Sequence, residues 1–235
     1  VVNTGAGNDT LTGGTGNDQL MGGTGNDTYI FNVGDGVDTI TDMAAAGEGN
    51  TLEFGTGITP TDLTLGVGSL LIRVGTNGDA IHLTNFDPTN VLGPRTIETF
   101  RFADGTVLSY DQLIARGFDL TGTAGNETIP GTNVVDRING LAGDDTIQSG
   151  AGNDVLSGGT GDDTYLFNLG DGLDRIEDTA AVGEGNRIQF GTGISQASLT
   201  FTRDEAARTL TIQVGSSGTD KLVLTNFYTT GATGS

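Results

Sequence analysis

An acidic residue returns every nine positions in two stretches of this chain. The acids of the first stretch are Asp9, Asp18 and Asp27, and those of the second are Glu127, Asp136, Asp145, Asp154 and Asp163. Carboxylates stacked at a fixed spacing repel one another unless a cation lies between them. Carboxylate and backbone carbonyl oxygens form the hard shell that Ca²⁺ prefers, whereas Mg²⁺ demands a strict octahedron and retains water. The spacing therefore predicts calcium binding.

The chemistry of common enzymes is missing from the sequence. There is no Cys, and His82 is the one His, so thiolate catalysis, disulfides and Cys- or His-based zinc sites are excluded. The lipase Gly-x-Ser-x-Gly turn, the phosphate-binding Gly-rich loop, the dinucleotide fingerprint and the EF-hand pattern are also absent. The pair Asp144 and Asp145 imitates a glycosidase dyad, but its repetition every nine residues favours calcium ligation. We expect no enzyme activity in this chain.

The amino-acid composition limits the classes of partner that this chain could bind. The 235 residues include 41 Gly, and 10 basic against 30 acidic residues give a formal charge of −20. Nucleic acids and anionic membranes both require Lys and Arg, so neither is expected as a partner. No apolar run approaches the roughly 18 residues of a membrane helix. With 34 % apolar residues, the chain needs something other than a large core to hold it.

Each acid is the sixth residue of a nine-residue unit whose eighth residue is apolar, as in residues 13–21 and 22–30. Gly at the first, second and fourth positions permits positive φ and close approach of neighbouring backbone. We expect six residues of turn and three of strand, with two units in each coil. Same-side turns then lie 18 residues apart along the sequence and stack at about 4.8 Å.

This stacking pairs the acids across neighbouring coils. The pairs are 9/27, 18/38, 127/145, 136/154, 145/163 and 154/174, where Asp38 and Asp174 belong to a degenerate unit that follows each run. The pairs predict roughly six calcium sites between turns. The positive charge of the bound calcium ions would cancel much of the chain's negative charge.

These units resemble the RTX family of calcium-binding nonapeptide repeats, and residues 13–21, 22–30 and 158–166 carry every position of its pattern. The resemblance implies a parallel β-roll with Ca²⁺ held between stacked turns. Two units depart from the pattern, with Val134 at a Gly position and Glu127 in place of Asp. Carried over residue by residue, the implied metal-binding set is Asn8, Asp9, Gly14, Gly16, Asn17, Asp18, Gly23, Gly25, Asn26, Asp27, Asp38, Asp136, Gly140, Ala142, Asp144, Asp145, Gly150, Gly152, Asn153, Asp154, Gly159, Gly161, Asp162, Asp163 and Asp174.

The segment after each run is also repeated. Residues 27–86 and 163–227 share Gly-Glu-Gly-Asn, Phe-Gly-Thr-Gly-Ile and Leu-Thr-Asn-Phe. We therefore predict an all-β fold of tandem parallel β-rolls, each followed by a small β-rich cap module that serves as a polar-faced end. The expected boundaries are roll 1 at 1–42, cap 1 at 43–119, roll 2 at 120–178 and cap 2 at 179–235. Strands are expected at 69–75, 80–86 and 209–214, and a short helix at 110–116 after Ser109.

Residues 96–118 have no counterpart after the second cap, and the first run has two units fewer than the second. We therefore expect the sequence to be a piece of a longer protein with a truncated second cap, and residues 231–235 to be partly foreign.

The leading functional hypothesis is a calcium-dependent structural module that is disordered without Ca²⁺ and folds on export. The family resemblance implies a secreted or cell-surface bacterial protein that uses type I secretion machinery. The alternative is a ligand- or carbohydrate-binding segment of a surface adhesin. For that alternative Phe86, Phe227 and Tyr228 are the candidate contacts.

Overall fold

The computed structural model describes residues 1–42, 47–178 and 183–227, so Tyr228 and residues 231–235, singled out above, lie outside it. The chain divides into two compact units, unit 1 (Val1–Phe118) and unit 2 (Asp119–Ser235). The four-part division predicted from the sequence stays a prediction. In the described residues, no helix is both long and apolar enough to span a membrane.

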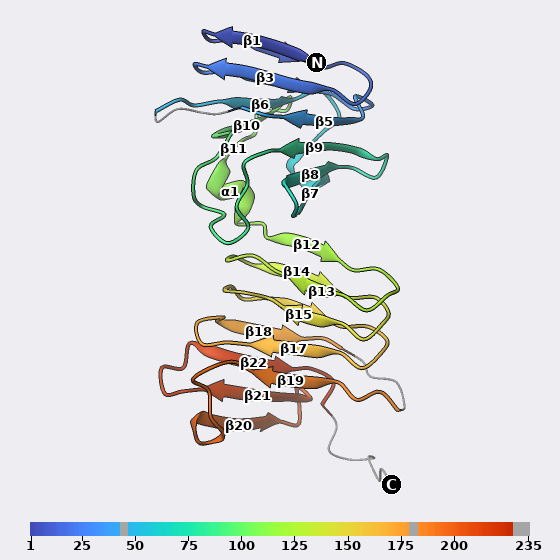
Figure 1. The fold of residues 1–235 in the computed structure, drawn as a ribbon, viewed down its shortest axis with the longest axis vertical. Helices are drawn as coiled ribbons and strands as arrows, with labels where there is room; N and C mark the ends of the chain where they lie inside the picture. Colours follow the sequence, from blue (N-terminus) through green and yellow to red (C-terminus); the bar gives the residue numbers. More distant parts are fainter. Residues whose placement is uncertain (43–46, 179–182, 228–235) are drawn as a thin grey trace. The chain divides into compact units, whose positions relative to one another are not determined.

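Unit 1 contains two sheets (Figure 1). In order of pairing, one sheet consists of β1 (Val2–Ala6), β3 (Gln19–Thr24), β5 (Val37–Ile40), β9 (Asp79–Leu83), β8 (Leu70–Val74) and β7 (Leu63–Gly66). The other consists of β2 (Thr10–Thr12), β4 (Thr28–Phe31), β6 (Thr51–Phe54), β10 (Thr99–Phe102) and β11 (Val107–Ser109). A 3₁₀ turn η1 (Pro60–Asp62) precedes β7, α1 (Tyr110–Ile114) follows β11, and β12 (Phe118–Thr121) lies at the boundary of the units.

Unit 2 repeats this plan. Its first sheet is β14 (Asp136–Asn139), β16 (Val155–Ser157), β18 (Leu173–Ile176), β22 (Asp220–Leu224), β21 (Thr209–Val214) and β20 (Leu199–Asp204). Its second sheet is β13 (Thr128–Pro130), β15 (Thr146–Gln148), β17 (Thr164–Phe167) and β19 (Arg187–Phe190), and η2 (Gln196–Ser198) precedes β20. The fold is nearly all-β.

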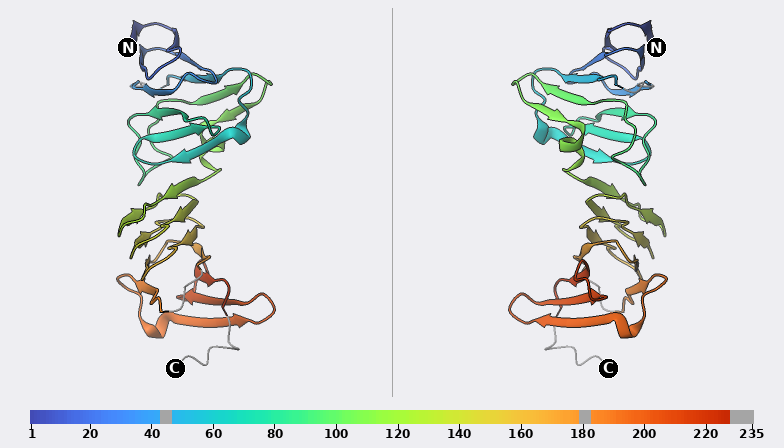
Figure 2. Two further views of the ribbon diagram at one scale, coloured as in Figure 1. Left: turned by 90° about the vertical axis from the view of Figure 1, so that its right-hand side faces the viewer. Right: turned by 90° about the vertical axis from the view of Figure 1, so that its left-hand side faces the viewer.

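The repeats form parallel stacked coils, which confirms the predicted fold class (Figure 2). Leu11 of β2 pairs with Tyr29 of β4, and Ile147 of β15 pairs with Tyr165 of β17, each 18 residues further on. The eighth residue of each unit points inward, and Leu11, Leu20 and Ile147 are at most 2 % exposed. One apolar side chain per strand makes a narrow core, so the polar turns must contribute to holding the coils together.

An antiparallel hairpin follows each roll, and its last strand continues the stack. In unit 1, β9 pairs parallel with β5 and antiparallel with β8. In unit 2, β22 pairs in the same way with β18 and β21. The strands expected near 69–75, 80–86 and 209–214 are confirmed as β8, β9 and β21.

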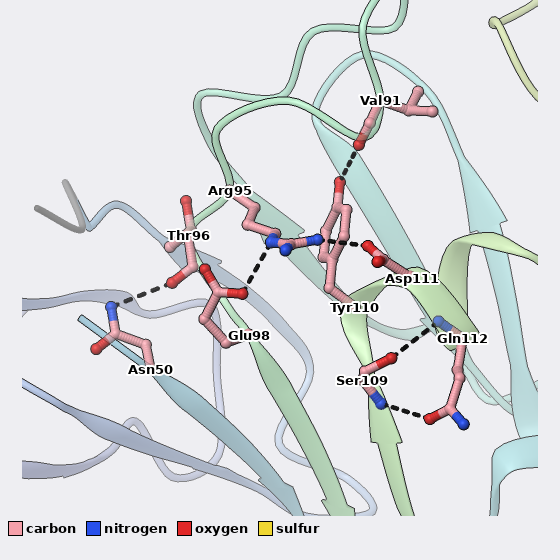
Figure 3. Close-up of polar contacts among 9 residues, drawn as sticks. All are labelled: Asn50, Val91, Arg95, Thr96, Glu98, Ser109, Tyr110, Asp111 and Gln112. Carbon is pink, nitrogen blue, oxygen red and sulfur yellow. Dashed lines mark hydrogen bonds and ion pairs between the residues drawn. The ribbon is translucent and has the colours of Figure 1, made fainter. Parts of the chain in front are cut away.

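Unit 1 has one further part, the covering segment, which we define as residues 87–118. Its strand β10 pairs parallel with β6, and its helix α1 begins after Ser109, whose side chain accepts a hydrogen bond from the Gln112 N–H, as the sequence predicted. Arg95 pairs with Glu98 at 2.8 Å and with Asp111 at 2.5 Å, and the Tyr110 hydroxyl donates to the Val91 carbonyl at 2.9 Å; Figure 3 shows which residues these contacts join. These contacts lie within the covering segment and hold its loop against α1.

Candidate metal centre

The glycines of each turn have two different roles. Most Gly residues at the second and fourth positions adopt positive φ, for example 102° at Gly23 and 124° at Gly25, whereas Gly125 and Gly152 do not. The first-position Gly has no positive φ, for example at Gly13 and Gly22. A Cβ at Gly22 would lie 2.2 Å from Oδ2 of Asp27, so this Gly makes room for the carboxylate of its own repeat.

Neighbouring coils approach so closely that a carbonyl oxygen of one lies where a Cβ of the next would be. A Cβ at Gly25 would lie 2.1 Å from the Gly7 oxygen, and one at Gly161 would lie 2.2 Å from the Gly143 oxygen. Only Gly permits this approach, because any other residue carries a Cβ there. The turns therefore bring carbonyl oxygens together between coils.

The sixth-position acids form a ladder through the stack. In every one of the six pairs expected from the sequence, the backbone N–H of the first residue donates to Oδ1 of the second, at 2.8–3.1 Å. The ladder fixes the orientation of each Asp through Oδ1, and the second carboxylate oxygen, Oδ2, takes no part in it.

Six of these Oδ2 atoms are buried without a hydrogen-bond partner. They belong to Asp9, Asp27, Asp38, Asp145, Asp154 and Asp163. An ionised carboxylate oxygen that is removed from water and left without a partner costs several kcal/mol, unless a cation compensates it. Buried orphan oxygens at a regular spacing beside carbonyl-lined turns fit Ca²⁺.

Burial also changes the acidity of these groups. Loss of hydration raises the pKa of Asp154 to about 8 and that of Asp174 to about 7. It raises the pKa of Asp136 to about 6. The pKa values of Asp27, Asp38 and Asp163 are raised too, chiefly by the same desolvation. A divalent cation beside these oxygens would oppose that shift by favouring the charged form.

The two units that depart from the repeat pattern satisfy their own acids. Asp136 Oδ2 accepts from the Thr132 N–H at 2.6 Å, and the Thr132 hydroxyl contacts both of its oxygens at 3.1 Å. Glu127 accepts from the Thr123 N–H at 2.8 Å and from the Thr123 hydroxyl. Asp174 Oδ2 accepts from the Ser149 hydroxyl at 3.0 Å. These oxygens have less need of a cation than the six orphans.

The fifth-position side chains in the implied metal set hold the coils together. Each uses its Oδ1 to accept a backbone N–H of the next coil, at 2.6–3.2 Å. These residues are Asn8, Asn17, Asn26, Asp144, Asn153 and Asp162. Gly16, Ala142 and Gly152 form single parallel bridges to the next coil. Of the other glycines of the set, Gly23 lies in β3, and metal ligation by the whole set stays a prediction.

The ladders through Asp27 and Asp163 each end on a group that sequence reasoning missed. The N–H of Asp27 donates to an amide oxygen, Oδ1 of Asn50, and the N–H of Asp163 donates to Oδ1 of Asn186, both at 2.8 Å. Beside them, the Tyr29 hydroxyl donates to Asp42 Oδ2 at 2.5 Å and accepts from the Gly22 N–H. Tyr165, Asp178 and Gly158 repeat this arrangement. The sequence signal was a Tyr at the eighth position of the last unit in each run, where earlier units have Leu or Ile.

Side-chain ligands alone do not complete a site. Over residues 1–42, 47–178 and 183–227, no three His, Cys, Asp or Glu side chains gather with metal-binding geometry. An ion between two coils would therefore take most of its oxygens from backbone carbonyls. This is the donor set of a calcium-binding turn rather than that of a transition-metal site.

The aromatic residues considered for ligand binding differ in their surroundings. Phe86 packs against Phe118, with ring centroids 5.6 Å apart, so it anchors the covering segment. Phe227 is half-buried. His82 hydrogen-bonds Ser69 at 2.7 Å.

The stacked coils and their carboxylate ladders define a calcium-binding β-roll. Comparison with known families agrees, because the model of the RTX calcium-binding nonapeptide repeat (4 copies) matches residues 1–29 and 130–165. The model of the haemolysin-type calcium binding protein related domain matches residues 70–112. The repeats of this chain are RTX calcium-binding nonapeptide repeats.

Two solved structures resemble the chain. The AlgE6R3 subunit of the Azotobacter vinelandii mannuronan C5-epimerase is 25 % identical, with 51 % of this chain and 82 % of that chain covered and a TM-score of 0.33. The extracellular lipase LipA from Serratia marcescens is 18 % identical, with 92 % of this chain covered and a TM-score of 0.27. The chain spans 37 % of that lipase. No curated protein matches the chain.

Proposed function

We propose that this chain is a structural module that requires Ca²⁺ to fold, and that its role is not catalytic. The observation that carries the proposal is the set of six buried Oδ2 atoms without a hydrogen-bond partner, five at sixth positions of the repeats and one, that of Asp38, in the degenerate unit that follows the first run. In the absence of a cation these oxygens oppose folding, and a chain with a formal charge of −20 and few apolar residues has the composition of disorder.

The ions would lie between stacked turns, roughly six in all, one for each carboxylate pair. Asp9, Asp27 and Asp38 would contribute carboxylate oxygens in unit 1, and Asp145, Asp154 and Asp163 in unit 2. A ligand that binds only the folded state stabilises it by about 2.7 kcal/mol per site at a hundredfold excess over Kd. Several coupled sites would make folding a steep function of calcium concentration.

This dependence suits export. RTX repeat proteins are typically secreted bacterial proteins. Low calcium inside the cell would keep the chain unfolded, and millimolar calcium outside would fold it. Passage through type I secretion machinery and an extracellular or cell-surface location belong to this proposal.

The test is circular dichroism of the full chain during titration from EDTA into calcium, with magnesium as the matched control. We expect a cooperative gain of β signal with calcium and little change with magnesium. A folded spectrum in EDTA that calcium leaves unchanged would contradict the folding switch.

A further inference from the structure

The second sheet ends on different strands in the two units. In unit 1, β6 lies between β4 and β10, with Phe100 paired to Leu52 and Phe102 paired to Phe54. In unit 2, β19 pairs with β17 and is the last strand of its sheet among the described residues. An edge strand presents a row of backbone N–H and C=O groups to which another strand can add.

The same difference appears in burial. Leu52 and Phe54 of β6 are 1 % and 3 % exposed, whereas their counterparts Ile188 and Phe190 of β19 are only half-buried. On the adjoining hairpin, Phe201 is 57 % exposed. An apolar surface of this kind, next to an open strand edge, is typical of an interaction site.

A cavity of about 210 Å³ adjoins β19, lined by Tyr165, Ile176, Asp178, Asn186, Arg187, Ile188, Leu224 and Thr225. We call this cavity and the exposed edge of β19 the β19 groove. The tyrosine and isoleucine are buried in both units, but Asp42 of unit 1 is 2 % exposed whereas its counterpart Asp178 is half-buried.

Unit 1 shows what fills the corresponding space. The Asn50 side chain donates to the Thr96 carbonyl at 3.1 Å, and the Thr96 hydroxyl donates to the Thr84 carbonyl at 3.1 Å (Figure 3 shows the first contact). The N–H of Glu98 donates to the Asn50 carbonyl at 2.9 Å. Ile97 is fully buried. Asn186 and Thr225 stand in unit 2 at the positions of Asn50 and Thr84.

We propose that the β19 groove accepts a polypeptide segment with the chemistry of residues 96–102, added as a parallel strand against β19. The segment would supply a hydroxyl residue and an aliphatic residue to the cavity, followed by aromatic residues at alternate positions along the strand. Backbone hydrogen bonds would provide affinity, and the side-chain pockets would provide specificity. This inference rests on the internal duplication and is independent of the role of calcium.

Charge refines the choice of segment. In unit 1, Arg101 pairs across the strands with Glu53 at 3.5 Å, and Thr99 lies opposite Thr51. In unit 2, Gln189 replaces Glu53 and the exposed Arg187 replaces Thr51. The groove therefore favours an acidic residue at the position of Thr99, and Gln189 offers no charge to an Arg at the position of Arg101.

The experiment uses the full chain in millimolar calcium and three synthetic peptides. The first has the sequence of residues 94–118, the second carries Thr99→Glu and Arg101→Gln, and the third carries Phe100→Ser and Phe102→Ser. We expect the second peptide to bind most tightly and the third at least tenfold more weakly than the first. Hydrogen exchange should show protection of β19, whereas β6 should not change.

A charge reversal keeps the test independent of folding, because Arg187 is exposed and its substitution leaves the core intact. In the Arg187→Glu chain, the preference should reverse, so that the Thr99→Glu, Arg101→Gln peptide binds at least fivefold more weakly than to the natural chain. Absence of protection at β19 with any peptide would overturn the proposal. So would equal binding of the serine peptide, or a dimer of the chain alone that protects β19, because a second copy would then be the occupant.

Discussion

The two units build the same roll and the same hairpin, yet they bury the hairpin to different depths. Leu65 of β7 is 1 % exposed, and its counterpart Phe201 of β20 is 57 % exposed. The carboxylate ladders are alike in both units, with N–H to Oδ1 distances of 2.9 Å at the pair 9/27 and at the pair 145/163. The roll therefore depends on polar contacts between coils, whereas the cap depends on an apolar cover that, in the part of the chain that the structure describes, only unit 1 supplies.

Truncating Phe100 of the covering segment should remove the difference in burial between the two hairpins. Phe100 is fully buried, so Phe100→Ala should cost about 3–5 kcal/mol of unfolding free energy in unit 1. The matched control is Phe201→Ala in unit 2, with an expected cost within about 0.5 kcal/mol because the ring is exposed. Denaturant unfolding followed by hydrogen exchange of each unit measures both. Equal costs would show that Phe201 is covered in solution.

Blocking the approach of the coils should damage both rolls alike. Gly25→Ala and Gly161→Ala place a Cβ within 2.2 Å of a carbonyl oxygen of the neighbouring coil. Gly16 has almost the same φ, 128° against 124° for Gly25, but open space where the Cβ would be. Gly16→Ala therefore controls for backbone strain, and we expect Gly25→Ala to cost about 2 kcal/mol more, measured by thermal unfolding in calcium. Similar losses for Gly16 and Gly25 would contradict close stacking of the coils.

The tyrosines that end the ladders should distinguish the units again. Tyr29→Phe leaves Asp42 Oδ2 and the Gly22 N–H each without one partner in a buried site, and we expect a loss of about 1–3 kcal/mol. Tyr165→Phe should cost less, because Asp178 is only half-buried and water can replace the hydroxyl. Unfolding free energies of the two variants in calcium provide the measurement. A larger loss at Tyr165 would reverse the comparison.

The raised pKa values of buried carboxyl groups give the smallest expected difference between the two units. Asp154 and Asp174, with pKa values raised to about 8 and about 7, lie in unit 2. A carboxyl whose pKa is raised by folding destabilises the folded state as it ionises, so the free energy of folding without calcium should become less favourable as pH rises from about 4 toward 8. In calcium, protons compete with the metal, and the midpoint for unit 2 should rise by up to about tenfold per pH unit on acidification.

The change should be smaller in unit 1. Calcium titrations at several pH values, followed by hydrogen exchange of each unit, test this comparison. Calcium midpoints that do not depend on pH would show that these carboxylates do not take part in calcium binding.

Much of the roll could be predicted because it is periodic. The nine-residue spacing of Gly and Asp encodes the pairs 9/27 and 145/163 directly, and the structure brings each pair into contact. The spacing did not predict that Gly22 makes room for the side chain of Asp27 in its own repeat, because that contact depends on how the carboxylate is oriented.

The ends of the ladders could not be predicted in this way. Asn50 and Asp42 occur once in each unit, so no period marks them, and their partners lie 23 and 13 residues earlier in the chain. Self-satisfaction of Asp136 by Thr132 depends on a side-chain conformation that spacing does not encode. The difference in cap burial required knowledge of which surface residues 87–118 cover.

The tyrosine–aspartate contacts beside the ends of the ladders through Asp27 and Asp163 also determine how the coils align with one another. Near-identical coils can slip past one another by one whole coil, 18 residues, with their Asp-on-Asp hydrogen bonds conserved, so the repeats alone define a set of almost equivalent alignments. Tyr29 with Asp42, and Tyr165 with Asp178, can form in one alignment only. A single phenolic hydroxyl in each unit thus selects one alignment of the coils from that set.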